Sequence, residues 1–187
     1  MRIVTGIHKG HALSRPPGHI TRPMMDKVRE SVFNILMHQN WKVCSGTILE
    51  GAIVLDAFAG SGAIGLEAIS RGAKQAYFFD KSPKALGIVR ENVWNLKEQD
   101  RCKLLKVDAT NPPRAPQSMD LVFLDPPFGK NLVLACLPPL IKTGWINNNT
   151  IIVAEVESGK PLSLPAGVHI LLEKSYGAAQ VFFLQLT

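Results

Sequence analysis

Short apolar segments recur along the chain from residue 52 onward, and segments with helical spacing separate most of them. A chain that alternates strands with helices forms a mostly parallel sheet, because each connection must cross over one face of that sheet. The expected strands are 52–55, 76–79, 104–107, 121–124, 151–154, 169–174 and 180–186. The last two are joined by a turn at Tyr176 and Gly177 without a helix, which is typical of an antiparallel hairpin. We therefore predict an α/β fold with a seven-stranded sheet and one antiparallel edge hairpin.

The first 22 residues differ from the rest of the chain. Residues 2–5 and 11–13 are expected to pair as a small β-hairpin, with turn residues between them. This segment carries several cations and no acid, and the whole chain has a net charge of +6. An acid-free basic arm on a basic protein favours contact with a polyanion. We divide the chain into a hairpin arm, residues 1–22, and a main domain, residues 23–187, which opens with a helix from Asp26 to Gln39.

A glycine-rich loop follows the first strand of the main domain and leads into a helix at 62–70. Gly60, Gly62 and Gly65 match the spacing of nucleotide-binding loops, in which the backbone approaches the ligand closely. Asp56 ends the strand, and its carboxylate would repel the pyrophosphate of a dinucleotide. S-adenosylmethionine carries an ammonium and a sulfonium instead of phosphate, so the loop favours this cofactor over NAD or FAD. A purely structural turn, capped by Asp56, is the alternative interpretation.

Two further acids follow the next strands. Asp80 lies about 20 residues beyond the loop, where an acid usually binds ribose hydroxyls. Asp108 follows the third strand and is expected to reach the adenine amino group. The carboxyl ends of parallel strands share one edge of the sheet, so these acids should meet. The predicted cofactor-binding residues from these motifs are Asp56, Ala57, Phe58, Gly60, Ser61, Gly62, Asp80, Lys81, Asp108, Ala109 and Asp125.

The fourth strand ends in the tetrapeptide Asp125, Pro126, Pro127 and Phe128. Consecutive prolines restrict the backbone and should hold the Asp125 carboxylate and the Pro126 carbonyl as two fixed acceptors. An exocyclic amino group of a base donates two hydrogen bonds, and two acceptors can orient its lone pair toward a methyl group. Phe128 offers a surface on which the base can stack. We predict that these four residues are catalytic; a plain strand end with Phe128 in the core is the alternative.

With these motifs the chain resembles the bacterial 16S ribosomal RNA guanine-N2 methyltransferases. The resemblance is carried by Thr21-Arg22-Pro23, by the segments 26–30, 56–67 and 121–128, and by the hairpin glycines. It implies a Rossmann-like class I methyltransferase fold and transfer of a methyl group to a guanine N2 of 16S rRNA, within the assembled small subunit. By resemblance, Arg22 and Pro23 would lie over the cofactor. The RNA-binding residues implied are Arg2, Lys9, Arg15, Arg22 and Arg29.

The chain departs from this pattern at Met24-Met25, at Lys27, and at His8 and His11, which affects the expected RNA contacts.

Other functions stay open: an N6-adenine methyltransferase on DNA or RNA, a protein glutamine methyltransferase, or a non-catalytic RNA-binding assembly factor. We expect Glu67 to be structural. We expect core or lid packing for the three tryptophans, Trp41, Trp94 and Trp145.

The cysteines lack metal-ligand spacing. The spacing of His8, His11 and His19 could suit a metal, but no acid or cysteine joins them, so we expect RNA contact or plain surface there and no metal. Neither a signal peptide nor a membrane helix is expected, and we predict a cytoplasmic monomer without a membrane partner.

Overall fold

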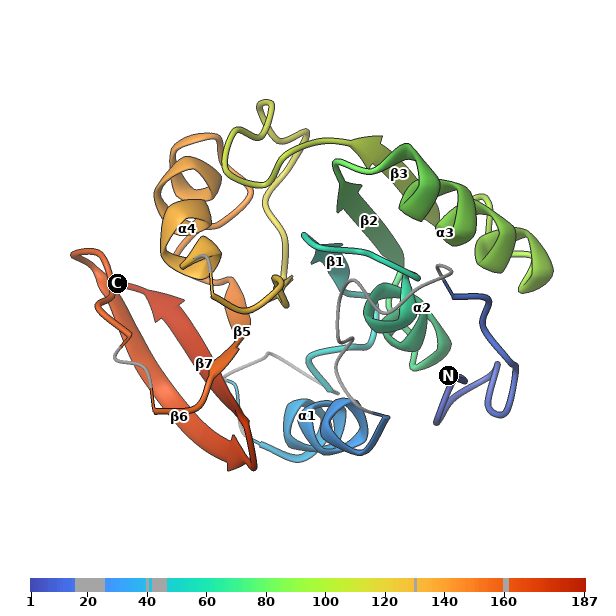
Figure 1. Cartoon of the computed structure of the whole chain (residues 1–187), viewed down its shortest axis with the longest axis horizontal. Helices are drawn as coiled ribbons and strands as arrows, with labels where there is room; N and C mark the ends of the chain where they lie inside the picture. Colours follow the sequence, from blue (N-terminus) through green and yellow to red (C-terminus); the bar gives the residue numbers. More distant parts are fainter. Residues whose placement is uncertain (16–25, 40, 42–46, 130, 160–161) are drawn as a thin grey trace.

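The computed structural model describes residues 1–15, 26–39, 41, 47–129, 131–159 and 162–187. Its centre is a seven-stranded sheet with the order β3-β2-β1-β4-β5-β7-β6 (Figure 1). The strands are β1 (Ile53–Asp56), β2 (Gln75–Asp80), β3 (Cys102–Lys106), β4 (Leu121–Leu124), β5 (Ile151–Glu157), β6 (Val168–Tyr176) and β7 (Ala179–Leu186). The first five run parallel, whereas β7 pairs antiparallel with both β5 and β6. The predicted sheet and its edge hairpin are confirmed.

Helices cover both faces of the sheet. The helices are α1 (Asp26–His38), α2 (Ala63–Ser70), α3 (Pro83–Asn95) and α4 (Leu132–Lys142). The first three pack on one face and α4 on the other (Figure 1). Successive strand side chains point to opposite faces, so Phe78 joins the core under α2 and α3 whereas Phe79 joins the core under α4. Burial on both sides explains why β1 and β4 are almost entirely apolar.

The strand order fixes the location of a ligand site. From β1 the chain moves outward to β2 and β3, and it then returns to place β4 on the other side of β1. Ligands of doubly wound sheets bind at the carboxyl ends of the strands, where the order reverses in this way. The segments that follow β1 and β4 are those predicted to carry the cofactor loop and the catalytic tetrapeptide.

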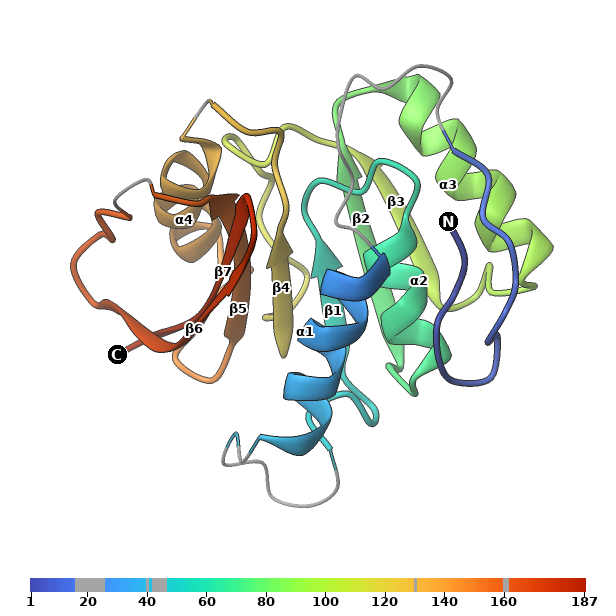
Figure 2. The same cartoon turned by 60° about the horizontal axis from the view of Figure 1, so that its bottom comes forward.

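The N-terminal segment, which we define as residues 1–14, lies along α2 and α3 (Figure 2). Its hairpin is small: Arg2 and Ala12 form a single antiparallel bridge, and Ile3 donates from its amide to the His11 carbonyl at 3.0 Å. Ile3 and Leu13 are buried in the main core. The segment is therefore packed onto the domain rather than extended from it.

The three tryptophans differ in their surroundings. Trp145 is buried, and Trp41 is half-buried and stacked on Phe183. Trp94 on α3 is 69% exposed, so the expectation that it packs in the core or a lid is wrong. Among the described residues, none of the helices has the length and apolar character needed to cross a membrane.

Candidate functional site

The acids predicted from the strand ends do lie at one edge of the sheet. Asp56 and Asp80 are the last residues of β1 and β2, Asp108 follows β3, and Asp125 follows β4. Because these strands are parallel, their carboxyl ends share this edge. The acids differ in exposure: Asp56 is buried, Asp80 and Asp125 are half-buried, and Asp108 is exposed. The edge thus combines carboxylates in environments that range from solvent to protein interior.

The glycine loop is tied to Asp80. The Gly60 amide donates to Asp80 Oδ2 at 3.0 Å, and the Ser82 amide donates to Asp80 Oδ1 at 2.8 Å. Gly60 and Gly62 have φ angles of +55° and +78°, which side chains other than glycine rarely adopt. The loop conformation therefore depends on glycine at these positions and on the acid that ends β2.

Asp56 lies beneath the loop and is almost completely inaccessible, with 1% of its surface exposed. Its Oδ2 accepts a hydrogen bond from the Gly65 amide at 3.1 Å. Its Oδ1 has no hydrogen-bond partner within the part of the chain that the structure describes. Burial raises the pKa of Asp56 to about 7; the backbone amides of Gly65 and Phe58 oppose this rise, and the charges of Asp125 and Asp80 add to it. A cation bound beside this carboxylate would stabilise its ionised form.

Asp108 is held differently. Its Oδ1 accepts hydrogen bonds from the amide and the hydroxyl of Thr110, at 3.0 and 2.7 Å. These bonds lower the pKa of Asp108. The neighbouring predicted residues Ala57 and Ala109 are buried, and Lys81 is exposed. Asp108 is therefore an ionised acceptor at the rim of the edge, in contrast to Asp56.

Three residues of the tetrapeptide after β4, Pro126, Pro127 and Phe128, line a small cavity of about 50 Å³, and Asp125 immediately precedes them in the chain. Pro126 is buried, whereas Phe128 is 37% exposed and so is not a core residue. The cavity is also lined by Glu155 and Glu157 at the carboxyl end of β5. These two glutamates were not predicted as site residues; their position at the end of a strand that neighbours β4 is the signal that could have found them.

A larger hollow of about 590 Å³ lies between α1 and β6. Its lining includes Lys27, His38 and Lys174 but none of the loop or tetrapeptide residues. It is thus separate from the edge that gathers the acids, and its size alone does not make it the site.

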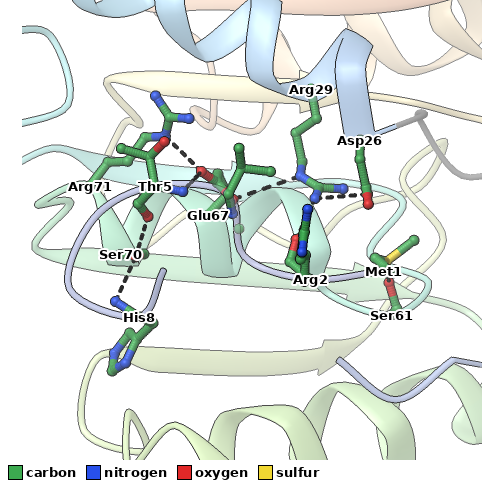
Figure 3. Close-up of polar contacts among 12 residues, drawn as sticks. Met1, Arg2, Thr5, His8, Asp26, Arg29, Ser61, Glu67, Ser70 and Arg71 are labelled. Atoms are coloured by element: carbon green, nitrogen blue, oxygen red, sulfur yellow. Dashed lines mark hydrogen bonds and ion pairs between the residues drawn. The ribbon is translucent and has the colours of Figure 1, made fainter. Parts of the chain in front are cut away.

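The residues predicted to bind RNA fall into two groups. Arg2, Lys9 and Arg15 are exposed. Arg29 is only 1% exposed, and its Nη2 donates to the Arg2 carbonyl at 2.7 Å and to Asp26 at 3.0 Å (Figure 3). This burial contradicts the expectation that Arg29 contacts RNA. Arg22 and Pro23, predicted over the cofactor, lie outside the described residues.

Glu67 on α2 anchors the N-terminal segment, in agreement with the structural role expected for it. Its fully buried carboxylate accepts hydrogen bonds from the amides of Val4 and Thr5, at 2.8 and 3.0 Å (Figure 3). Arg71 donates to the same carboxylate at 2.8 Å, and Arg29 Nε lies 3.8 Å away. The segment is therefore fixed to the helix that begins at the glycine loop.

Comparison with known proteins shows the family. The first 185 residues match the family described as Conserved hypothetical protein 95. The Ribosomal RNA small subunit methyltransferase D of Haemophilus influenzae is 32% identical over 181 residues, which cover 95% of this chain and 89% of the relative. The chain belongs to the family of small-subunit ribosomal RNA methyltransferase D.

Two further comparisons support this methyltransferase D family membership. A candidate rRNA methyltransferase of Bacillus subtilis is 32% identical over 186 residues, covering 97% of this chain and 96% of the relative. A solved structure of a candidate methyltransferase from Escherichia coli superposes with a TM-score of 0.81 at 29% identity, covering 100% of this chain and 97% of the other. The fold is thus that of the class I methyltransferases, as the resemblance implied.

Proposed function

We propose that this methyltransferase D family member transfers a methyl group from S-adenosylmethionine to the exocyclic N2 of a guanine in 16S rRNA. The fold and the named relatives imply S-adenosylmethionine as the methyl donor and ribosomal RNA as the substrate. The observation that carries the proposal is the set of acids at the carboxyl edge, with the tetrapeptide after β4 beside a cavity.

The chemistry of Asp56 fits a cationic cofactor. Its buried carboxylate has one oxygen without a partner among the described residues and a pKa near 7, so a bound positive charge would offset the cost of ionising it. We assign Asp56 to the positive groups of the cofactor, Asp80 to its ribose and Asp108 to its adenine amino group. The remaining predicted contacts come from Ala57, Phe58, Gly60, Ser61, Gly62, Lys81 and Ala109, with Arg22 and Pro23 expected above them.

When bound, S-adenosylmethionine supplies a methyl group on a sulfonium sulfur, which is a good leaving group. The protein must then orient a weakly nucleophilic amine. We assign the two hydrogens of the amine to the Asp125 carboxylate and the Pro126 carbonyl. Asp125 also offers a carboxylate for the proton that the nitrogen loses as its bond to the methyl carbon forms. Phe128, which is partly exposed at the cavity, is available to stack on the base.

The lining of the cavity favours guanine over adenine. Beside the N2 amine, the pairing edge of guanine carries an N–H donor at N1, from which a further carboxylate can accept. Adenine has an acceptor at N1, which a carboxylate would repel. Glu155 and Glu157 place carboxylates on the lining that also includes Pro126 and Phe128. We therefore assign to them the recognition of guanine.

Methyl transfer from labelled S-adenosylmethionine tests the proposal. The wild-type protein is incubated with unmodified small subunits, with naked 16S rRNA and with DNA, and the labelled nucleoside is identified after digestion. We expect label on guanine N2 of ribosomal RNA, with more label on assembled subunits than on naked RNA. Label on adenine N6 would contradict the assignment of the base. Cofactor binding without label on any nucleic acid would favour the protein methyltransferase or the assembly factor.

A further inference from the structure

Helix α3 carries a tryptophan, Trp94, most of whose surface is not packed against the rest of the protein. Trp94 is 69% exposed, and Ile7 in the N-terminal segment is 72% exposed. Isolated exposed apolar side chains are common, so exposure alone carries no conclusion. The arrangement of charges around Trp94 is the informative feature.

The N-terminal segment runs beside this part of α3. His8 Nε2 lies 2.5 Å from Glu98 Oε1, and the Ser14 hydroxyl donates to Glu91 Oε1 at 2.7 Å. Glu91 and Glu98 are about one helical turn before and after Trp94 in the sequence. The two contacts therefore hold residues 8–14 against α3 and the residues that follow it, and Figure 2 shows the N-terminal segment beside this helix.

These contacts leave an uneven distribution of charge. Glu98 is paired with His8 and Arg101, whereas Glu91 is exposed and accepts a hydrogen bond from the neutral Ser14 hydroxyl. Arg90 lies about one helical turn before Trp94 and Lys97 follows the end of α3; both are exposed, and no ion pair involves either of them among the described residues. Lys9 of the adjacent segment is also exposed. Trp94 thus has two exposed cations near it in the chain, Arg90 and Lys97, that no ion pair among the described residues neutralises.

We infer that Arg90, Trp94, Lys97 and Lys9 form an RNA-contacting surface, with Trp94 as a stacking platform for a base and the cations on phosphates. This inference rests on the proposed function and extends it to a second contact away from the reacting base. Single-stranded nucleic acid is bound by this combination of aromatic rings and positive charge. A protein partner would need a larger apolar area than one tryptophan and one isoleucine provide.

The position of Trp94 determines what it can affect. It is eleven residues beyond Pro83, where α3 begins at the carboxyl edge, and a rise of about 1.5 Å per residue separates them by roughly 16 Å along the axis. Trp94 is therefore too far from the edge to contact the reacting base or the cofactor. It can contact RNA that flanks the target, so it should change RNA affinity and leave cofactor affinity unchanged.

Equilibrium binding to unmodified small subunits and 16S rRNA tests the surface. We compare Trp94→Ala and Trp94→Phe with Asn95→Ala, which alters an exposed neighbour on the same helix. Loss of one stacked base should raise the RNA Kd of Trp94→Ala by about 5- to 150-fold. Trp94→Phe should retain most of the affinity. The melting temperature and the S-adenosylmethionine Kd should match wild type in all three.

The salt dependence of RNA binding tests whether Arg90 and Lys97 contact phosphates. Arg90→Gln combined with Lys97→Gln should reduce the slope of log K against log salt by about 1.4, at roughly 0.7 per single-strand phosphate contact. An RNA Kd for Trp94→Ala equal to that of Asn95→Ala, with normal methylation, would show that Trp94 does not contact RNA. That result would not contradict the proposed function. Trp94-dependent RNA binding without methyl transfer to any RNA would instead contradict the proposed function alone.

Discussion

The side-chain amide of Asn92 on α3 donates a hydrogen bond to the main-chain carbonyl of Ser61 in the glycine loop, at 2.9 Å. The same amide donates to the Ser14 carbonyl at 3.1 Å, and Asn92 Oδ1 accepts from the Ser14 amide at 2.8 Å. Asn92 is 1% exposed. One buried side chain therefore joins the N-terminal segment, α3 and the proposed cofactor loop.

Asn92→Ala should weaken cofactor binding. The change leaves the Ser61 carbonyl and the Ser14 backbone groups without these partners, and each buried polar group left unsatisfied costs about 1–3 kcal/mol. If the cofactor-bound state loses about 1 kcal/mol more than the free protein, the S-adenosylmethionine Kd rises roughly fivefold, which calorimetry would detect. Asn95→Ala is the control on the same helix. An unchanged cofactor Kd with a lowered melting temperature would restrict Asn92 to a role in stability.

Glu67→Gln should strongly destabilise the fold. It replaces a fully buried carboxylate that faces Arg71 and Arg29, and removing one partner of a buried ion pair costs about 3–5 kcal/mol. Denaturant titration would measure the fall in the free energy of unfolding. Glu50→Gln, at an exposed position, is the matched control and should leave that free energy within about 0.5 kcal/mol of wild type. Equal stability of the two variants would refute the anchoring role of Glu67.

Cofactor affinity should depend on pH through Asp56. Its pKa is raised from 3.8 to about 7, so the unfolded chain ionises this group before the folded protein does. The contribution of Asp56 to stability is accordingly largest at low pH, falls as pH rises from about 4 to about 7, and is constant above that. A cationic ligand favours the ionised carboxylate, so binding near pH 7 should release a proton.

Calorimetry in buffers with different ionisation enthalpies would measure that proton release. We expect a fraction of a proton to be released by wild type at pH 7 and less at pH 8. Asp56→Asn should show no pH-dependent release from this position. Cofactor affinity that stays constant from pH 6 to pH 8 would contradict the assignment of Asp56 to the positive groups of the cofactor.

Gly65→Ala should destabilise the packing of α2 on the sheet. A Cβ at this position would lie 2.3 Å from Cε1 of the Phe78 ring, so the ring or the helix must move. Such overpacking costs about 1–3 kcal/mol. Gly87→Ala on α3 meets no atom within 4 Å and should stabilise its helix by about 0.5–1 kcal/mol. We expect Gly65→Ala to lower the melting temperature and Gly87→Ala to raise it. Shifts of the same sign would contradict this difference between the two positions.

The sequence predicted the sheet and the grouping of the acids because strong local patterns specify both. Each acid directly follows an apolar strand, and parallel pairing then brings the strand ends to one edge whatever the side-chain details. Asp56, Asp80 and Asp108 could be grouped for this reason before any contact was known.

The environments of single side chains were harder to predict, because they depend on which surfaces meet. Arg29 was expected on the RNA side but is buried against Glu67. Glu67 inside the otherwise apolar helix 63–70 was the sequence signal that a cation such as Arg29 would be buried against it. Trp94 was expected to be packed, although the buried stripe of α3 passes through Val89, Asn92 and Val93 and leaves it outside. The role of Asn92 required the position of Ser14, which the sequence does not give.

Single-turnover methyl transfer by Asp125→Asn shows whether the Asp125 carboxylate takes part in the reaction. The rate on unmodified small subunits is compared with wild type at saturating S-adenosylmethionine, and the Kd values for cofactor and RNA are measured on the same preparations. Asp100→Asn, at an exposed position, is the control. We predict a rate lower by about 100-fold or more, the size of effect expected when one fixed acceptor in the transition state is removed, with an RNA Kd near wild type. A rate equal to that of Asp100→Asn would contradict a catalytic role for the Asp125 carboxylate.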